Sequence, residues 1–117
     1  MKAALLISHG SRSPLTKKEV ESLVAQLRMK SGIKIFEYAF LEIESPDIPE
    51  GIRRCADQGA TEIVILLNFL NSGRHVDEDV PRIVREAHKL YPQISINFTS
   101  PVGQHPKIGD LFLDLIK

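Results

Sequence analysis

Three histidines in this chain lie in the segments that follow short apolar runs, which is where a folded domain commonly places its chemistry. They are His9, His75 and His105, and a carboxylate, Glu42, follows a further apolar run. Imidazole is the commonest transition-metal ligand in proteins, and it also titrates near neutral pH. Histidines with a carboxylate and no paired cysteines suit a borderline divalent metal such as cobalt, iron, nickel or zinc. Because these residues lie far apart in the sequence, only the fold can assemble them into one site.

Four apolar runs supply the strands that would position these residues. The first and third are almost continuously apolar, as is typical of central parallel strands covered on both faces. The second contains Lys34 and Glu37, which favours an edge strand. The predicted strands are Ala3–Ile7, Ile33–Phe40, Ile63–Leu67 and Ile94–Phe98.

Each predicted strand is followed by apolar residues with a helical period. Ser13-Pro14 and Ser45-Pro46 each place a capping residue before a proline in the first turn, acidic residues 77–79 indicate another helix start, and Gly59 indicates a helix end. We therefore predict one α/β domain over residues 1–117, a (βα)4 unit with a four-stranded parallel sheet, helices on both faces and strand order 2-1-3-4. The four apolar helix faces are Val20/Leu23/Val24/Leu27, Ile48/Ile52/Cys55/Ala56, Val80/Ile83/Val84/Ala87 and Ile108/Leu111/Phe112/Leu115.

Ligands of open parallel sheets bind outside the carboxyl ends of the strands. The predicted fold therefore gathers His9, His75 and His105 at one edge, whereas His88 lies within a helix as a solvated residue. Other roles stay open: His9 could cap the next helix, His75 could be an ordinary surface residue, and Glu42 could simply be solvated. Residues 77–79 are most simply a helix start, and an acidic route for metal entry is the alternative.

Composition excludes several classes of function. The 117 residues include 15 basic and 15 acidic side chains, so no net positive charge favours nucleic-acid binding. No apolar run approaches the roughly 20 residues needed to span a bilayer. The one cysteine, Cys55, lies on an apolar helix face and permits no internal disulfide, so we expect a core residue in a cytoplasmic protein.

Four segments in register resemble the small sirohydrochlorin chelatases of cobalamin and siroheme synthesis, the CbiX/SirB type. The resemblance implies a chelatase-like fold (half of a flavodoxin-like arrangement) and insertion of cobalt or iron into sirohydrochlorin. It implies that His9 and His75 hold the metal, and that a single-domain chain acts as a homodimer with its sites near the interface. The segments are Leu6–Arg12, Ala39–Glu42 with Ser45–Ile48, Asn68–Val76 and Gly103–Pro106.

The resemblance leads to a hypothesis for each site residue. His9 and His75 would hold the ion and accept pyrrole protons, with Glu42 as an auxiliary base or as a carboxylate that balances the charge of the metal. The divalent metal (cobalt, or else iron or nickel) is a substrate, and no organic cofactor is needed. The substrate is a polycarboxylate, so arginines are natural clamps for it. The expected substrate-binding residues are Ser11, Arg12, Arg74 and His105.

Alternative interpretations remain at this stage. Arg12 and Arg74 could pair with nearby carboxylates, and His105 could be a helix-start device or a pocket wall. A histidine followed by glycine and arginine also resembles histidine-based phosphotransfer enzymes, although these carry arginine before the His-Gly pair, where this chain has Ser8. The same histidines could alternatively serve a metal-binding module without catalysis.

Overall fold

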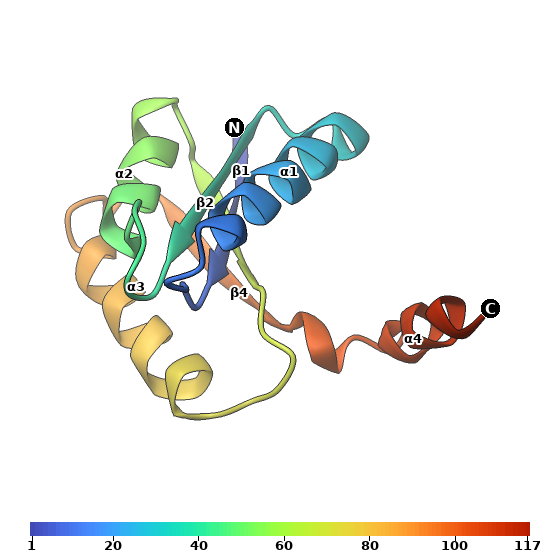
Figure 1. The fold of residues 1–117 in the computed structure, drawn as a ribbon. Coiled ribbons are helices and arrows are strands. Elements are labelled where there is room, and N and C mark those ends of the chain that lie inside the picture. Colours follow the sequence, from blue (N-terminus) through green and yellow to red (C-terminus); the bar gives the residue numbers. More distant parts are fainter.

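Strands and helices alternate along the chain in the computed structural model, which describes residues 1–117 (Figure 1). The strand boundaries agree with the predicted apolar runs to within about three residues, and a helix follows each strand as predicted. In chain order they are β1 (Lys2–Ser8), α1 (Pro14–Ser31), β2 (Ile35–Phe40), α2 (Ile48–Asp57), β3 (Glu62–Leu67), the π-helical turn η1 (His75–Asp79), α3 (Val80–His88), β4 (Ser95–Pro101), the short 3₁₀ turn η2 (Val102–Gln104) and α4 (Ile108–Ile116).

The four strands form one parallel sheet in the order β2-β1-β3-β4, which confirms the predicted order. Strand β1 pairs on both sides, and its Ile7 lies opposite Ala39 of β2 and Leu67 of β3. These three strands therefore end at nearly the same level. The loops that follow β1, β2 and β3 consequently leave the same edge of the sheet.

Helices cover the two faces of the sheet unequally. Helices α2 and α3 cover one face, over a core of 17 buried residues that includes Ile52, Ile65 and Val84. Helix α1 alone covers the other face, over a smaller core of six buried residues that includes Val20 and Val24. The predicted core position of Cys55 is confirmed, since the residue is fully buried, and burial raises the pKa of its thiol to about 12.

Local capping chemistry sets the helix starts. Ser13 caps α1 as predicted, because its side chain accepts a hydrogen bond from the Leu15 N–H. The prediction that Ser45 caps the second helix is wrong. Asp47 caps α2 instead, with its carboxylate 3.0 Å from the Glu50 nitrogen, and Ser45 lies in the preceding loop. Aspartate competes well for this position because its short carboxylate reaches the free N–H groups of the first turn.

Helix α4 differs from the other helices because it does not pack on the sheet (Figure 1). It forms where the apolar period predicted a helix, yet none of its residues is buried. Leu111 and Leu115 of the predicted apolar face are 62% and 81% exposed. The face of the sheet shared with α1 therefore lacks a second helix. None of the helices, α4 included, combines the length and the apolar character that crossing a membrane requires.

We predict that the sheet and α2 dominate the stability of the domain. Ile52 is fully buried between α2 and the sheet, so Ile52→Ala leaves a cavity and should lower the free energy of unfolding by about 2–5 kcal/mol. Urea denaturation followed by circular dichroism measures the change. Met29→Ala, at a side chain that is 86% exposed, is the matched control and should change stability by less than about 0.5 kcal/mol. Equal effects of the two substitutions would contradict this account of the core.

Candidate metal centre

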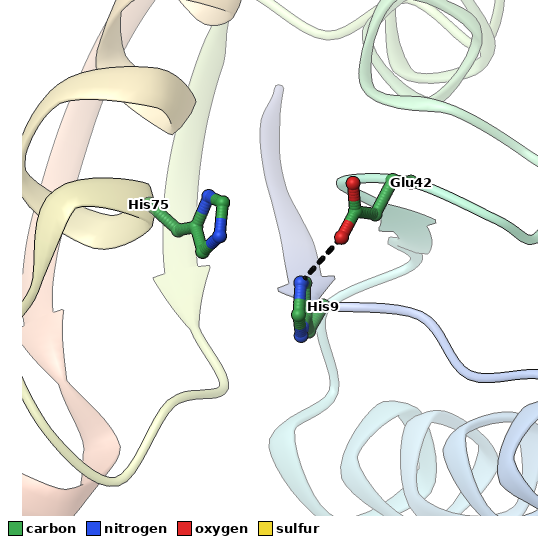
Figure 2. Close-up of side chains that lie close together, drawn as sticks. All are labelled: His9, Glu42 and His75. Carbon is green, nitrogen blue, oxygen red and sulfur yellow. Dashed lines mark hydrogen bonds and ion pairs between the residues drawn. The ribbon is translucent and has the colours of Figure 1, made fainter.

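Three of the residues singled out in the sequence meet at the carboxyl edge of the sheet. His9 follows β1, Glu42 follows β2, and His75 opens η1 after β3 (Figure 2). One possible ligand atom from each residue lies within 4.8 Å of the other two. The His9 Nε2 is 2.7 Å from the Glu42 Oε1, and the centroids of the two imidazole rings are 5.1 Å apart. The structure thus brings together the residues of the predicted metal site.

The pairing of β1 with β2 continues past the strands and places His9 beside Glu42. The Leu41 N–H donates to the Ser8 carbonyl at 2.8 Å, and the Glu42 N–H donates to the His9 carbonyl at 3.1 Å. These bonds extend the backbone ladder up to the site itself. The two side chains therefore start from backbone positions that are fixed relative to each other.

Gly10 permits the close approach of the two loops. Its φ of +104° lies in a region that favours glycine, and a Cβ at this position would lie 1.9 Å from the Glu42 carbonyl oxygen. Any side chain here would push the β1 loop away from the β2 loop. Gly10 is therefore required for the contact between His9 and Glu42.

Glu44 provides a second tie between the same loops. Its Oε2 accepts a hydrogen bond from the Ser11 N–H at 3.0 Å. The Ser11 hydroxyl in turn accepts from the Ser13 N–H at the start of α1. Ser11, predicted to contact substrate, is thus also part of the support of the β1 loop.

Asp79, predicted most simply as part of a helix start, positions His75. The His75 Nδ1 is 2.8 Å from the Asp79 Oδ2, and the arginine one turn further on, Arg82, approaches the same carboxylate at 3.5 Å. The hydrogen bond from His75 is the main reason that the pKa of Asp79 is lowered. Because the Nδ1 of His75 bonds to Asp79, Nε2 is the free nitrogen of the ring. The ring is directed toward His9 and Glu42 (Figure 2). The spacing of four residues within a helical segment was the signal that could have revealed this pair.

Buried neighbours hold η1 in place. Val76, directly after His75, is buried in the main core, and the Asp77 N–H bonds to the Gly73 carbonyl at 2.8 Å. The side chain of His75 nevertheless remains 52% exposed, and that of His9 is 48% exposed. The backbone of the site is therefore fixed, while the imidazoles stay accessible from solvent.

The remaining predicted residues lie around this cluster rather than in it. Arg12 is exposed and forms no ion pair, and Arg74 lies 3.7 Å from Glu78 in an exposed pair one helical turn away. His105 lies apart from the cluster, and its Nδ1 accepts a hydrogen bond from the Lys107 N–H at 3.0 Å. His88 is not simply solvated as predicted, because its Nε2 bonds to the Ile94 carbonyl.

The cluster has the donor set of a site for a borderline divalent metal, with two imidazoles and one carboxylate. The His9 and Glu42 ligand atoms already lie 2.7 Å apart, so a metal bonded to nitrogen and oxygen at about 2.1 Å needs mainly the His75 ring to move closer to that pair. Because all three side chains are about half exposed, rotation about their side-chain bonds can close the remaining ångström or so without moving the backbone. The sites left open on such an ion could take a further ligand from solution.

Relatives of this chain in sequence include proteins named sirohydrochlorin ferrochelatase and sirohydrochlorin cobaltochelatase. The chain is 30% identical over 116 residues to the sirohydrochlorin ferrochelatase of Priestia megaterium, a match that spans 99% of this chain and 44% of the relative. It is 34% identical to the sirohydrochlorin cobaltochelatase of Methanococcus aeolicus over 100% of this chain and 99% of that protein. The chain spans about half the length of the ferrochelatases that it matches, and nearly the full length of this archaeal relative.

Solved structures agree with the sequence matches. The sirohydrochlorin chelatase SirB from Bacillus subtilis subspecies spizizenii, in complex with cobalt, is 27% identical and superposes with a TM-score of 0.90 over 98% of this chain and 49% of that one. SirB from Bacillus subtilis with Fe³⁺ is 26% identical and superposes with a TM-score of 0.89 over 97% of this chain and 45% of that one. The family model described as CbiX matches residues 3–117. This chain therefore belongs to the CbiX family, the chelatase family that its motifs resembled.

Proposed function

We propose that this protein is a sirohydrochlorin chelatase that inserts a divalent metal, cobalt or iron, into the free-base tetrapyrrole. The observation that carries the proposal is the convergence of His9, Glu42 and His75 on one open edge of the sheet. Relatives across the length of the chain are named sirohydrochlorin ferrochelatase or cobaltochelatase, which supports the same activity and substrate. The metal is a substrate that leaves in the product, and no organic cofactor is required.

The two imidazoles would hold the incoming ion. Neutral histidine replaces part of the hydration shell of the metal with nitrogen ligands, which lowers the cost of stripping the remaining water. One ring nitrogen of each histidine belongs to the group of possible ligand atoms that lie within 4.8 Å of one another, so both imidazoles can bind one ion. Binding through neutral nitrogens and one carboxylate leaves the ion exchangeable, as a metal that must be passed on requires.

Metal insertion must also remove protons from the tetrapyrrole. Two pyrrole N–H protons leave the macrocycle as the divalent ion enters, so the metal complex keeps the charge of the free base. Glu42 is 2.7 Å from His9, so a proton accepted by that imidazole would be stabilised by an adjacent carboxylate. We assign the two protons to this pair: one would go to His9 as it releases the ion that it had shared with His75, and the other to Glu42.

The substrate would lie over the exposed edge, with its carboxylates at the periphery. Arg12 has no carboxylate partner in the structure, and the contact of Arg74 with Glu78 is long and exposed. Exposed pairs of this kind contribute little to stability. Both guanidinium groups are therefore free to bind substrate carboxylates, and Ser11 and His105 would complete the contacts from the neighbouring loops.

We further propose that the chain works as a cytoplasmic homodimer. The ferrochelatases that it matches are about twice as long, as expected if two such units cooperate, and α4 exposes an apolar surface that a second unit would cover. The free, buried Cys55 needs no oxidising compartment.

Two alternative functions lead to different expectations for the site and its activity. A histidine-based phosphotransfer enzyme would need an anion-binding group before the His-Gly pair, and here Ser8 is buried and bonded to Asn68. A metal-binding module without catalysis would bind cobalt through the same histidines but would leave sirohydrochlorin unchanged.

We predict that replacing both imidazoles abolishes insertion. The purified protein is mixed with sirohydrochlorin and Co²⁺, and visible absorption is followed against a protein-free control. His9→Ala/His75→Ala should lower the enzymatic rate by at least about 100-fold, because it removes both the ligands and the proton acceptor, while circular dichroism shows an intact fold. His88→Ala, outside the cluster, is the matched control and should retain activity. Full activity of the double variant would refute the site, and cobalt binding without turnover by the unmodified protein would favour the metal-binding module.

We predict that Asp79 acts through the tautomer of His75. Asp79→Ala should weaken Co²⁺ binding by about 10–100-fold, the usual effect of losing the partner of a ligating imidazole. Asp79→Asn keeps an acceptor oxygen and should retain more affinity, and Asp77→Ala, at an exposed neighbour, is the control. Nitrogen-15 NMR of the imidazoles reads the tautomer directly, with the proton of His75 on Nδ1 in the unmodified protein. An unchanged tautomer and unchanged affinity in Asp79→Ala would show that the contact has no positioning role.

A further inference from the structure

Ile43, between the two glutamates of the β2 loop, has a strained backbone. Its φ is +73°, and it is the only residue other than glycine with a positive φ. The Glu44 N–H donates to the Glu42 carbonyl at 2.8 Å, which closes a three-residue γ-turn around Ile43. Such a turn is rare and strained, and a β-branched residue with positive φ is a genuine outlier. Glycine or asparagine would adopt the same conformation more easily.

Packing does not account for an isoleucine at this position. The side chain of Ile43 is 60% exposed, and it belongs to neither of the two buried cores. The residue therefore adds strain to the free protein without a matching gain from burial. Strained residues of this kind persist at functional sites and ligand clamps, where the conformation serves the function. The apolar side chain is thus available for contact with a molecule other than this chain.

The neighbouring residues hold the γ-turn against the metal centre from both sides. Before Ile43, the Glu42 N–H donates to the His9 carbonyl at 3.1 Å, and the Glu42 carboxylate bonds to the His9 ring at 2.7 Å. After Ile43, the Glu44 carboxylate accepts from the Ser11 N–H at 3.0 Å. Figure 2 shows Glu42 on this loop, close to His9. The turn that carries Ile43 is therefore fixed beside the ligands before any substrate binds.

The proposed substrate needs one kind of contact that the residues assigned above do not supply. A tetrapyrrole is a flat macrocycle with an apolar face, and its carboxylates lie only at the periphery. The arginines can bind these carboxylates and the imidazoles can bind the ion, but neither offers apolar surface to the face of the ring. Ile43 is an exposed apolar residue that directly follows Glu42 of the donor cluster.

We propose that Ile43 is a substrate-binding residue whose side chain packs against the face of the macrocycle while the cluster holds the ion. The inference rests on the chelatase function proposed above and adds an apolar contact to it. Burial of an exposed isoleucine against the ring removes apolar surface of both partners from water. Because the γ-turn is already fixed in the free protein, little conformational entropy is lost when the ring binds.

Binding of sirohydrochlorin without metal tests this contact. The tetrapyrrole is titrated with the unmodified protein, Ile43→Asn and Ile43→Val, and its fluorescence is followed. Ile43→Asn tolerates the left-handed backbone but removes the apolar surface, so its affinity for sirohydrochlorin should fall by about 5–20-fold. Ile43→Val keeps a branched apolar side chain and should bind within about threefold of the unmodified protein. Leu90→Asn, at a side chain that is 77% exposed beyond the end of α3, is the matched control and should bind normally.

Two further measurements separate this contact from a purely structural role. The Co²⁺ affinity and the thermal midpoint of Ile43→Asn, both measured without tetrapyrrole, should not fall, because the turn and the donor cluster stay intact. In unmodified protein with isotope-labelled isoleucine methyl groups, sirohydrochlorin should shift the Ile43 signals upfield, as expected for groups over the face of a conjugated macrocycle. The signals of Ile52, which is fully buried in the core, should stay in place.

The outcomes distinguish this inference from the chelatase proposal. If the unmodified protein inserts metal but Ile43→Asn binds sirohydrochlorin equally well, the contact is refuted and the chelatase proposal stands. Unshifted Ile43 methyl signals in the complex would lead to the same conclusion. A parallel loss of Co²⁺ affinity in Ile43→Asn would show that Ile43 merely supports the Glu42 loop, which would also overturn the contact. If the unmodified protein binds no sirohydrochlorin, both proposals fail.

Discussion

The parallel pairing of β1 with β2 and β3 is the constraint on which the rest of this structure depends. It aligns the carboxyl ends of three strands, so that residues about thirty positions apart in the sequence leave the sheet at the same edge. His9, Glu42 and His75 each follow one of these ends. No local motif builds the donor cluster, and a shift in the pairing of any one strand would separate its members.

The site combines a rigid backbone with accessible side chains. Backbone bonds between the loops, the close contact at Gly10 and the hydrogen bond of Asp79 to His75 fix where the ligands begin and which nitrogen is free. The imidazoles themselves remain about half exposed. This suits the proposed reaction, because an ion that must enter from water and leave in a macrocycle should not be enclosed by the protein.

The sequence was most informative where a period or a topological rule applies. Continuous apolar runs predicted β1 and β3 as central strands. The strand-end rule gathered His9, His75 and His105 at one edge, and of these His9 and His75 meet while His105 lies apart from the cluster. Contacts set by side-chain geometry could not be predicted in this way. Whether Asp47 or Ser45 caps α2 depends on which short side chain reaches the first turn. Asp79 stands in a run of acidic residues of the kind that begins many helices, so nothing in the sequence marks it as the partner of a histidine. The apolar period of α4 predicted a helix correctly, but a period cannot tell which surface the helix covers.

The central claim is that one metal ion binds to both imidazoles. X-ray absorption spectroscopy of the unmodified protein loaded with one equivalent of Co²⁺ per chain tests it most directly. The account predicts two imidazole ligands per cobalt together with oxygen donors, and the loss of one imidazole in each single variant, His9→Ala and His75→Ala. A spectrum with no imidazole, or one that neither substitution alters, would contradict it.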